Sequence, residues 1–170
     1  MIDTDVIMKD ISNSTGNVIK ELQNFPSENF NTKPDRNTWS AAEIAEHIFI
    51  VESAINIILI GKTIPAETFS AEKTEKIKSR FLNFEEKLIA PSRISPSAGQ
   101  QNKQDIIDKI SACRSDLSNI ISKNDLTEIC LGFKHALFGE LTRIEWVYFN
   151  IYHSERHIHQ LRKLTSIFVH

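Results

Sequence analysis

Residues 141–168 read LTRIEWVYFNIYHSERHIHQLRKLTSIF and carry the clearest indication of the fold class. Thr142 is a favourable N-cap, and Glu145 three residues later completes a capping box. Apolar side chains then recur at helical spacing on one side, namely Ile144, Val147, Ile151, Ile158 and Leu161. The pattern predicts a long amphipathic helix from about Arg143 to near Phe168.

A second well-marked helix start lies upstream, in WSAAEIAEHIFIVESAINIILIGK at residues 39–62. Ser40 and Glu43 form another capping box, and Trp39 is placed to pack against Ile44 as a hydrophobic staple. The side of this helix that we expect to face inward carries Ile44, Ile48, Val51, Ile55 and Ile58.

Two further long helices are indicated by periodicity. The first of them ends at Pro26. Its apolar stripe consists of Ile7, Ile11, Val18, Leu22 and Phe25, and Ser14 or Thr15 occupies the one turn that lacks an apolar residue. The other ends near Asn124 and carries Ile107, Ile110, Cys113, Leu117 and either Ile120 or Ile121.

The region between the second and third long helices has weaker signals. Residues 70–88 predict a short, irregular amphipathic helix, and residues 89–102, rich in Pro, Ser and Gly, predict a long surface loop. Four long helices therefore predict an all-α four-helix bundle in one domain, residues 1–170, with a long crossover connection between helices two and three.

The composition argues against a nucleic-acid-binding, membrane or disulfide-rich protein. The 170 residues include 41% apolar and 25% charged residues and have a net charge of −2, which leaves no basic surface for nucleic acid or for an anionic membrane. No apolar run approaches the roughly 20 residues that span a bilayer, and the N-terminus lacks the features of a signal peptide, so we expect a cytoplasmic protein. Cys113 and Cys130 are too few for a disulfide framework, and Cys113 is expected to be a buried free thiol.

Three of the six histidines lie close together near the C-terminus. His153 and His157 are about 40° apart around a helix, so both are expected to face the bundle interior or its rim, and two imidazoles at this spacing can reach one metal ion. His159 lies about 200° further round and is expected to be solvated. The alternative is that His153 and His157 only cover the edge of the core.

His47 favours the metal site over this alternative, because it lies beside the inward apolar residues of the 39–62 helix. Burying a histidine costs free energy unless its ring is hydrogen-bonded or bound to a metal. His47, His153 and His157 would together give a three-nitrogen site with open positions, a pattern typical of catalytic metal sites. His135 is interpreted as a structural loop residue, and His170 is the terminal residue.

The carboxylates near these histidines are weaker candidates. Glu43 precedes His47 by four residues, but its capping role explains it better. Glu155 projects almost opposite His153 and His157, so HSERH at 153–157 does not supply a metalloprotease base. The Glu-x-x-His pairs of di-iron bundles are also absent from the sequence. The sequence therefore assigns no general acid or base.

The segments WSAAEIAEHI (39–48) and HALFGELTRIEWVYFNIYHSERHIHQL (135–161) resemble the DinB-like family, also called the YfiT-like metal-dependent hydrolases. The resemblance covers the chain from about Trp39 onward. It implies an up-down-down-up four-helix bundle and a divalent metal, nickel or zinc, held by His47, His153 and His157. One departure is Ala136, because many relatives have proline directly after the histidine at this place.

Members of that family often form homodimers and include thiol S-transferases that use bacillithiol, mycothiol or glutathione. The resemblance therefore implies a metal-dependent enzyme, either a hydrolase or a thiol S-transferase, that acts on a small-molecule substrate, with a low-molecular-weight thiol as a second cofactor. The alternative is a non-catalytic, stress-associated module in which the histidines hold a structural ion or which serves in protein interactions. A third reading is a bundle with buried histidines and no metal.

Overall fold

The computed structural model describes residues 3–66 and 71–169, so His170 lies outside the described residues. The helices are α1 (Thr4–Asn24), α2 (Ala41–Leu59), α3 (Ala71–Leu82), α4 (Lys103–Lys123) and α5 (Arg143–Phe168), with two 3₁₀ turns, η1 (Ser27–Asn29) and η2 (Ser92–Ile94). Two short strands, β1 (Thr63–Ile64) and β2 (Ile129–Cys130), pair antiparallel. Among these elements no helix is both long and apolar enough to cross a membrane.

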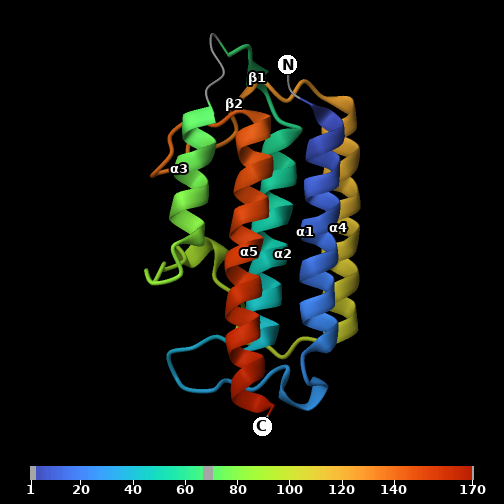
Figure 1. The fold of residues 1–170 in the computed structure, drawn as a ribbon, viewed down its shortest axis with the longest axis vertical. Coiled ribbons are helices and arrows are strands. Elements are labelled where there is room, and N and C mark those ends of the chain that lie inside the picture. Colours follow the sequence, from blue (N-terminus) through green and yellow to red (C-terminus); the bar gives the residue numbers. More distant parts are fainter. Residues whose placement is uncertain (1–2, 67–70, 170) are drawn as a thin grey trace.

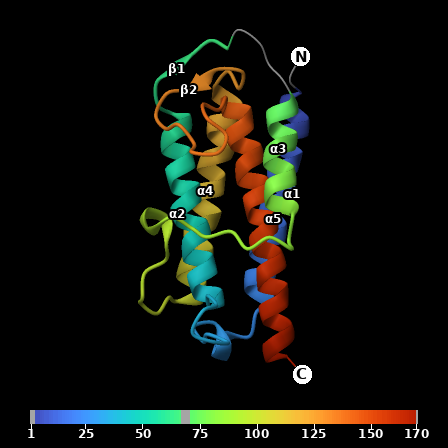
Figure 2. The same ribbon diagram turned by 90° about the vertical axis from the view of Figure 1, so that its left-hand side faces the viewer.

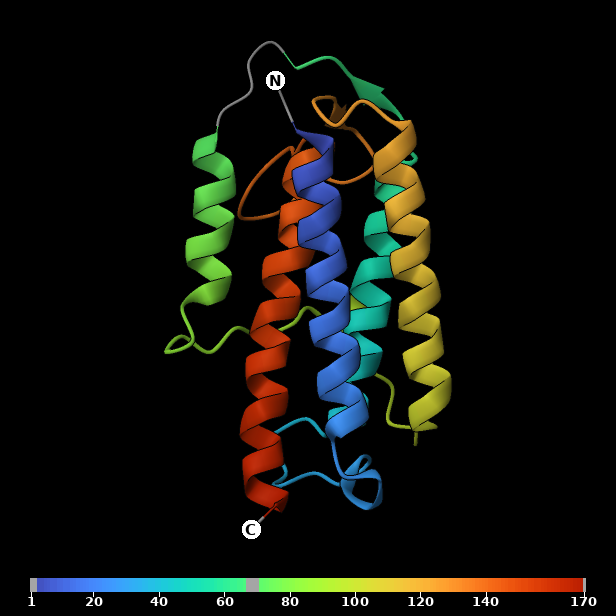
Figure 3. The ribbon, with the colours of Figure 1, turned by 45° about the vertical axis from the view of Figure 1, so that its right-hand side comes forward.

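Helices α1, α2, α4 and α5 form the four-helix bundle. Helix α1 packs against α4 and α5, and α2 packs against the same two helices, so α1 and α2 lie diagonally opposite each other (Figure 3). Figure 1 shows α1 and α5 running down the page, while α2 and α4 run up it. This is the up-down-down-up order that the family resemblance implies, and the predicted all-α bundle is confirmed.

The long crossover follows from this order, because α2 and α4 are parallel and the chain must return along the whole bundle between them. Helix α3, the short helix predicted within residues 70–88, makes the first part of this return and packs on α5. Residues 83–102 then cross in front of α5 and α2 to reach the start of α4 (Figure 2). The connection therefore lies over the two helices that carry the candidate histidines.

Both predicted capping boxes are formed. The Ser40 hydroxyl accepts a hydrogen bond from the Glu43 N–H at 3.2 Å, and the Glu43 carboxylate accepts one from the Ser40 N–H at 2.8 Å. Thr142 and Glu145 make the same reciprocal pair, at 3.4 and 2.7 Å. Such boxes satisfy backbone donors that a helix start otherwise leaves unpaired, so they fix where α2 and α5 begin.

The predicted apolar stripes are buried, with small differences. In α2 Ile58 is only half-buried and Leu59 is fully buried in its place, while in α4 Ile121 rather than Ile120 faces the core. The core has two apolar clusters, one around Ile55, Leu117 and Trp146 and the other around Leu22, Ile48 and Leu161. A layer of buried polar side chains lies between the two clusters.

An ion pair between Glu52 and Arg114 forms the centre of this polar layer. The guanidinium donates to both carboxylate oxygens, from Nε at 2.8 Å and from Nη2 at 2.5 Å. It also donates to the hydroxyls of Ser14, at 3.3 Å, and Ser154, at 2.6 Å. All four residues are buried, and they come from α1, α2, α4 and α5. Ser14 therefore interrupts the apolar stripe of α1 because it faces Arg114.

Breaking this pair from one side should strongly destabilise the protein. Arg114→Met or Glu52→Leu leaves one uncompensated buried charge, so we expect each to lower the free energy of unfolding by about 3–5 kcal/mol. The double variant removes both charges and should lose less than the sum of the single losses. Urea unfolding monitored by circular dichroism measures all three values.

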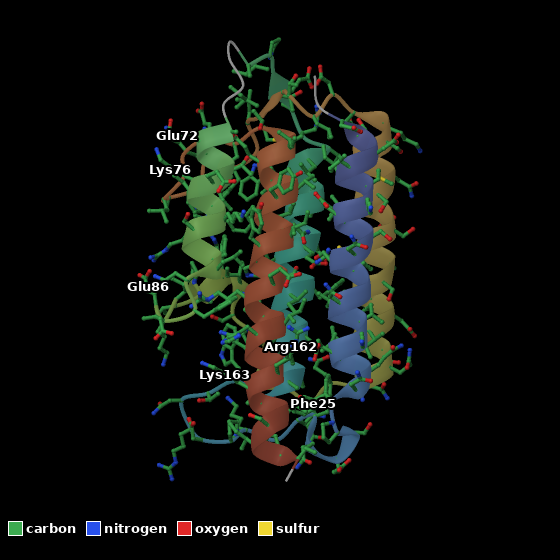
Figure 4. The ribbon with its side chains drawn as sticks, in the orientation of Figure 1. Phe25, Glu72, Lys76, Glu86, Arg162 and Lys163 are labelled. Carbon is green, nitrogen blue, oxygen red and sulfur yellow. The ribbon has the colours of Figure 1, made fainter. Side chains whose placement is uncertain are left out.

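The matched control is the exposed ion pair between Lys76 and Glu72 on the outer face of α3 (Figure 4). Because solvent screens this pair, Lys76→Ala should leave the urea midpoint nearly unchanged. Strictly additive losses for Glu52→Leu and Arg114→Met would show that the two buried charges do not depend on each other.

Candidate metal centre

Two of the three candidate ligands lie one turn apart on α5. His153 and His157 have ring centroids 4.4 Å apart, and their Nε2 atoms are 3.0 Å apart. Both side chains are buried, beside Ser154 of the polar layer. The Thr142 cap fixes the start of α5, and the helical repeat then turns both rings toward α2.

His47 on α2 completes the group. Its Nε2 lies 3.1 Å from Nε2 of His153, and its ring centroid lies 4.8 Å from that of His157. The three residues offer donor atoms within 4.8 Å of one another, and all three are buried. The structure therefore brings together the three histidines that the sequence singled out, from helices that are antiparallel neighbours.

The outer nitrogens of two of these rings are held by oxygen acceptors. His47 Nδ1 donates to the carbonyl oxygen of Ile94 at 2.7 Å, and His157 Nδ1 donates to the side-chain oxygen of Gln160 at 2.7 Å. Because a carbonyl oxygen can only accept, the proton sits on Nδ1 and the lone pair on Nε2. Outer partners of this kind are typical of histidines that bind metal.

The two inner-nitrogen spacings that involve His153 fit a common ion. Two nitrogens that each lie about 2.1 Å from one metal are about 3.0–3.4 Å apart for bond angles between about 90° and 110°. The separations of 3.0 and 3.1 Å in the structure fall in this range. Neutral imidazole lone pairs that face one another this closely repel unless a proton or a cation lies between them. The donor set, three neutral nitrogens, suits zinc and nickel.

His153 differs from the other two because its Nδ1 is buried and has no hydrogen-bond partner among the described residues. Its ring is instead held by aromatic neighbours. Phe149 stacks on it with a centroid distance of 5.9 Å, and Phe81 of α3 meets it edge-on at 5.5 Å. Trp39 packs against His47 at 4.9 Å. These rings exclude water from one part of the site.

Burial keeps the three histidines neutral. Desolvation is the largest cause in each case: it lowers the pKa of His47, lowers that of His153 well below its ordinary value, and lowers that of His157 to about 3. Repulsion from neighbouring histidines lowers the pKa of His153 and of His157 further. Neutral imidazole is the form that binds metal ions, so the rings are ready to act as ligands at physiological pH.

The two other histidines that the structure describes, His135 and His159, stay outside this group. His135 lies in the loop before α5, where its Nδ1 accepts hydrogen bonds from the N–H groups of Leu137 and Phe138, in agreement with a structural role. His159 points away from the triad, as predicted, but it is not fully solvated: its ring stacks on Phe84 with centroids 4.1 Å apart. The position of His159 around the helix predicted the direction of its side chain. Its stacking partner, Phe84, belongs to the connection after α3.

The two carboxylates and the cysteine also lie as predicted. Glu43 accepts the capping hydrogen bond and pairs with Lys33 at 2.7 Å. Glu155 lies in an open groove with Asp10 and Tyr152, between α1, α3 and α5. Cys113 is a buried free thiol, and burial raises its pKa to about 11.

Sequence reasoning missed the two outer acceptors. Gln160 lies three residues after His157, so helical spacing could have found it. The Ile94 carbonyl could not be found in this way, because its position depends on the path of the connection after α3. No periodic signal in the sequence gives that path.

The lowered histidine pKa values predict that the metal-free protein loses stability in acid. The unfolded chain takes up a proton on each histidine near pH 6.5, whereas folded His157 does so only near pH 3. The unfolded state therefore binds more protons between these values, and the free energy of unfolding falls as the pH falls. Below pH 6 His157 should contribute a slope of about 1.4 kcal/mol per pH unit, and the lowered pKa of His153 adds to the slope in the same direction.

Urea unfolding with a chelator present, between pH 6.5 and 5, measures this slope before most carboxylates begin to titrate. His157→Leu should reduce the slope by about 1.4 kcal/mol per pH unit in the lower half of this range. An unchanged slope in the variant would mean that folded His157 titrates normally.

Comparison with known proteins agrees with this fold. The family model of the DinB superfamily matches residues 11–161. The uncharacterized protein YuaE of Bacillus subtilis (strain 168) is 25% identical over 150 residues, which cover 85% of this chain and 88% of that protein. The crystal structure of TT2238, a four-helix bundle protein, has a TM-score of 0.60 at 17% identity and covers 95% of this chain and 99% of that one. The chain belongs to the DinB superfamily.

Proposed function

We propose that this protein is a divalent-metal-dependent enzyme in which His47, His153 and His157 hold the ion. The observation that carries the proposal is the convergence of three buried Nε2 atoms, with two of the outer nitrogens bonded to oxygen acceptors. Three protein nitrogens leave coordination positions for other molecules, as in catalytic rather than structural zinc sites. Nickel and zinc are the expected metals.

When bound, such an ion lowers the pKa of a water or thiol ligand toward neutrality. The protein residues then have three tasks: Ile94 and Gln160 orient the rings of His47 and His157, burial keeps the rings neutral, and Phe149 and Trp39 exclude water. The proposed reactions are transfer of a low-molecular-weight thiol to a small electrophile, or hydrolysis of a small molecule.

Metal analysis tests the ligand set. Protein purified without a histidine tag and loaded with zinc or nickel should retain about one ion per chain after gel filtration. His47→Ala and His153→Ala should each abolish this retention, because two nitrogens bind an ion far more weakly than three. His159→Ala is the matched control, since His159 lies on the same helix but points away, and it should retain the ion.

Activity distinguishes catalysis from a structural ion. Glutathione, bacillithiol and mycothiol are each incubated with chlorodinitrobenzene or an epoxide and the loaded protein, and product is followed by absorbance or mass spectrometry. We expect turnover that His47→Ala abolishes and His159→Ala preserves. Metal binding with a large loss of thermal stability on chelation, but no turnover of any thiol–electrophile pair, would instead assign the ion a structural role.

A homodimer in the cytoplasm completes the proposal. Large apolar side chains are exposed at the end of α2 and beyond β2, including Ile57 (68% exposed), Ile60 (65%) and Leu131 (48%), which supports self-association. Sedimentation velocity should give twice the 19.4 kDa chain mass. A species of single-chain mass at micromolar concentration would contradict this expectation.

A further inference from the structure

Residues 91–97, PSRISPS, form a short segment of the connection between α3 and α4 that we call the strap. Prolines stand at positions 91 and 96, and between them η2 makes one turn closed by hydrogen bonds from the N–H groups of Ile94 and Ser95. The residue before a proline favours extended backbone, and Ser95 has φ −71° and ψ 144°. The strap is therefore stiff for a loop of its length.

Besides the His47 hydrogen bond and the packing of the Ile94 side chain on the core, two contacts tie the strap to the rest of the protein. The carboxylate of Glu46 accepts hydrogen bonds from both the N–H and the hydroxyl of Ser97, at 2.9 and 3.0 Å. The guanidinium of Arg93 lies 4.6 Å from the centre of the Phe133 ring, in the loop before α5. The Ile94 carbonyl, which accepts from His47, lies between these two attachments.

The attachment through Glu46 has a direct geometric link to the candidate metal centre. Glu46 and His47 are consecutive on α2, and they bond to strap residues only three positions apart, Ser97 and Ile94. Two adjacent side chains of a rigid helix therefore hold one stiff turn at two points. If the contact between Glu46 and Ser97 is lost, the Ile94 carbonyl is held from one side only, by the contact between Arg93 and Phe133.

The start of the same connection is held in a similar manner. Arg156, the neighbour of His157 on α5, donates hydrogen bonds to the carbonyl oxygens of Phe81, Asn83 and Glu86. A residue adjacent to a candidate ligand thus anchors each half of the crossing that Figure 2 shows over α5 and α2.

We propose that Glu46 is a positioning residue: through Ser97 it holds the Ile94 carbonyl, which keeps the proton of His47 on Nδ1 and its Nε2 lone pair directed at the metal. This inference rests on the proposed metal-binding function. Without the carbonyl acceptor, the proton can move to Nε2 and block the ligand atom. Since coupling between two sites is reciprocal, metal binding should in turn stabilise the strap.

Three variants distinguish the effect of the hydrogen bonds between Glu46 and Ser97 from the effect of the negative charge of Glu46. Glu46→Ala removes the acceptor and the charge, Glu46→Gln keeps an oxygen acceptor but removes the charge, and Ser97→Ala removes one hydrogen bond and keeps the charge. Glu72→Ala is the control for loss of a surface carboxylate, because Glu72 lies on the outer face of α3, where it pairs with Lys76 (Figure 4).

Two measurements apply to each variant. Zinc affinity, from competition with a chromophoric chelator, should fall about three- to tenfold in Glu46→Ala and less in Glu46→Gln and Ser97→Ala, with no change in Glu72→Ala. In the metal-free protein, ¹⁵N NMR of the His47 ring should show the proton on Nδ1 in the wild type and a mixture of tautomers in Glu46→Ala. Hydrogen exchange at residues 92–97 should slow when zinc is added to the wild type.

The outcomes separate this inference from the proposed function. Wild-type affinity together with a wild-type His47 tautomer in Glu46→Ala would overturn the positioning role, even if the protein binds zinc tightly. A wild-type protein that binds no zinc would overturn the proposed function. A tautomer shift in metal-free Glu46→Ala would then still support the role of Glu46 in setting the His47 ring.

Discussion

The ion pair between Glu52 and Arg114 is the interaction on which the arrangement of the bundle depends. It is buried between two apolar clusters and, with Ser14 and Ser154, joins all four bundle helices. Apolar burial is non-directional, whereas a buried guanidinium must keep its acceptors at hydrogen-bond distance. Glu52 lies five residues after His47 on α2, and Ser154 is adjacent to His153 on α5. The ion pair therefore also fixes how far α2 and α5 are shifted along each other, and with it where the histidines meet. The fold and the candidate metal centre thus share one polar layer.

Much of the fold follows from local signals. The capping boxes at Ser40 and Thr142 mark the starts of α2 and α5 because a Ser or Thr followed by Glu satisfies backbone donors within a few residues. The inward direction of His47, His153 and His157 follows from the helical repeat, since each lies near buried apolar neighbours of its own helix. The up-down-down-up order needed the family resemblance, because helical periodicity says nothing about which helices are neighbours.

Contacts between distant segments could not be predicted from such signals. Ser14 was visible only as a gap in the apolar stripe of α1, and the reason for the gap is a guanidinium one hundred positions away. Glu52 and Arg114 resemble surface charges in the sequence, because burial of a charge depends on a partner that periodicity does not identify. The same holds for the Ile94 carbonyl and for Phe84 under His159: both belong to the connection after α3, whose path is set by side chains such as Arg156.

The crossover between α2 and α4 has a consequence for how proteins of this shape can change during evolution. Because loop-closure entropy grows only slowly with length, doubling such a connection costs about 0.6 kcal/mol, and insertions around α3 leave the caps and the polar layer in place. The strap is the exception, since an added residue between Pro91 and Ser97 would shift the carbonyl that His47 meets. Lengthening the connection on either side of the strap can therefore add new surface around the site. The length of the seven-residue strap itself is constrained by its contact with His47.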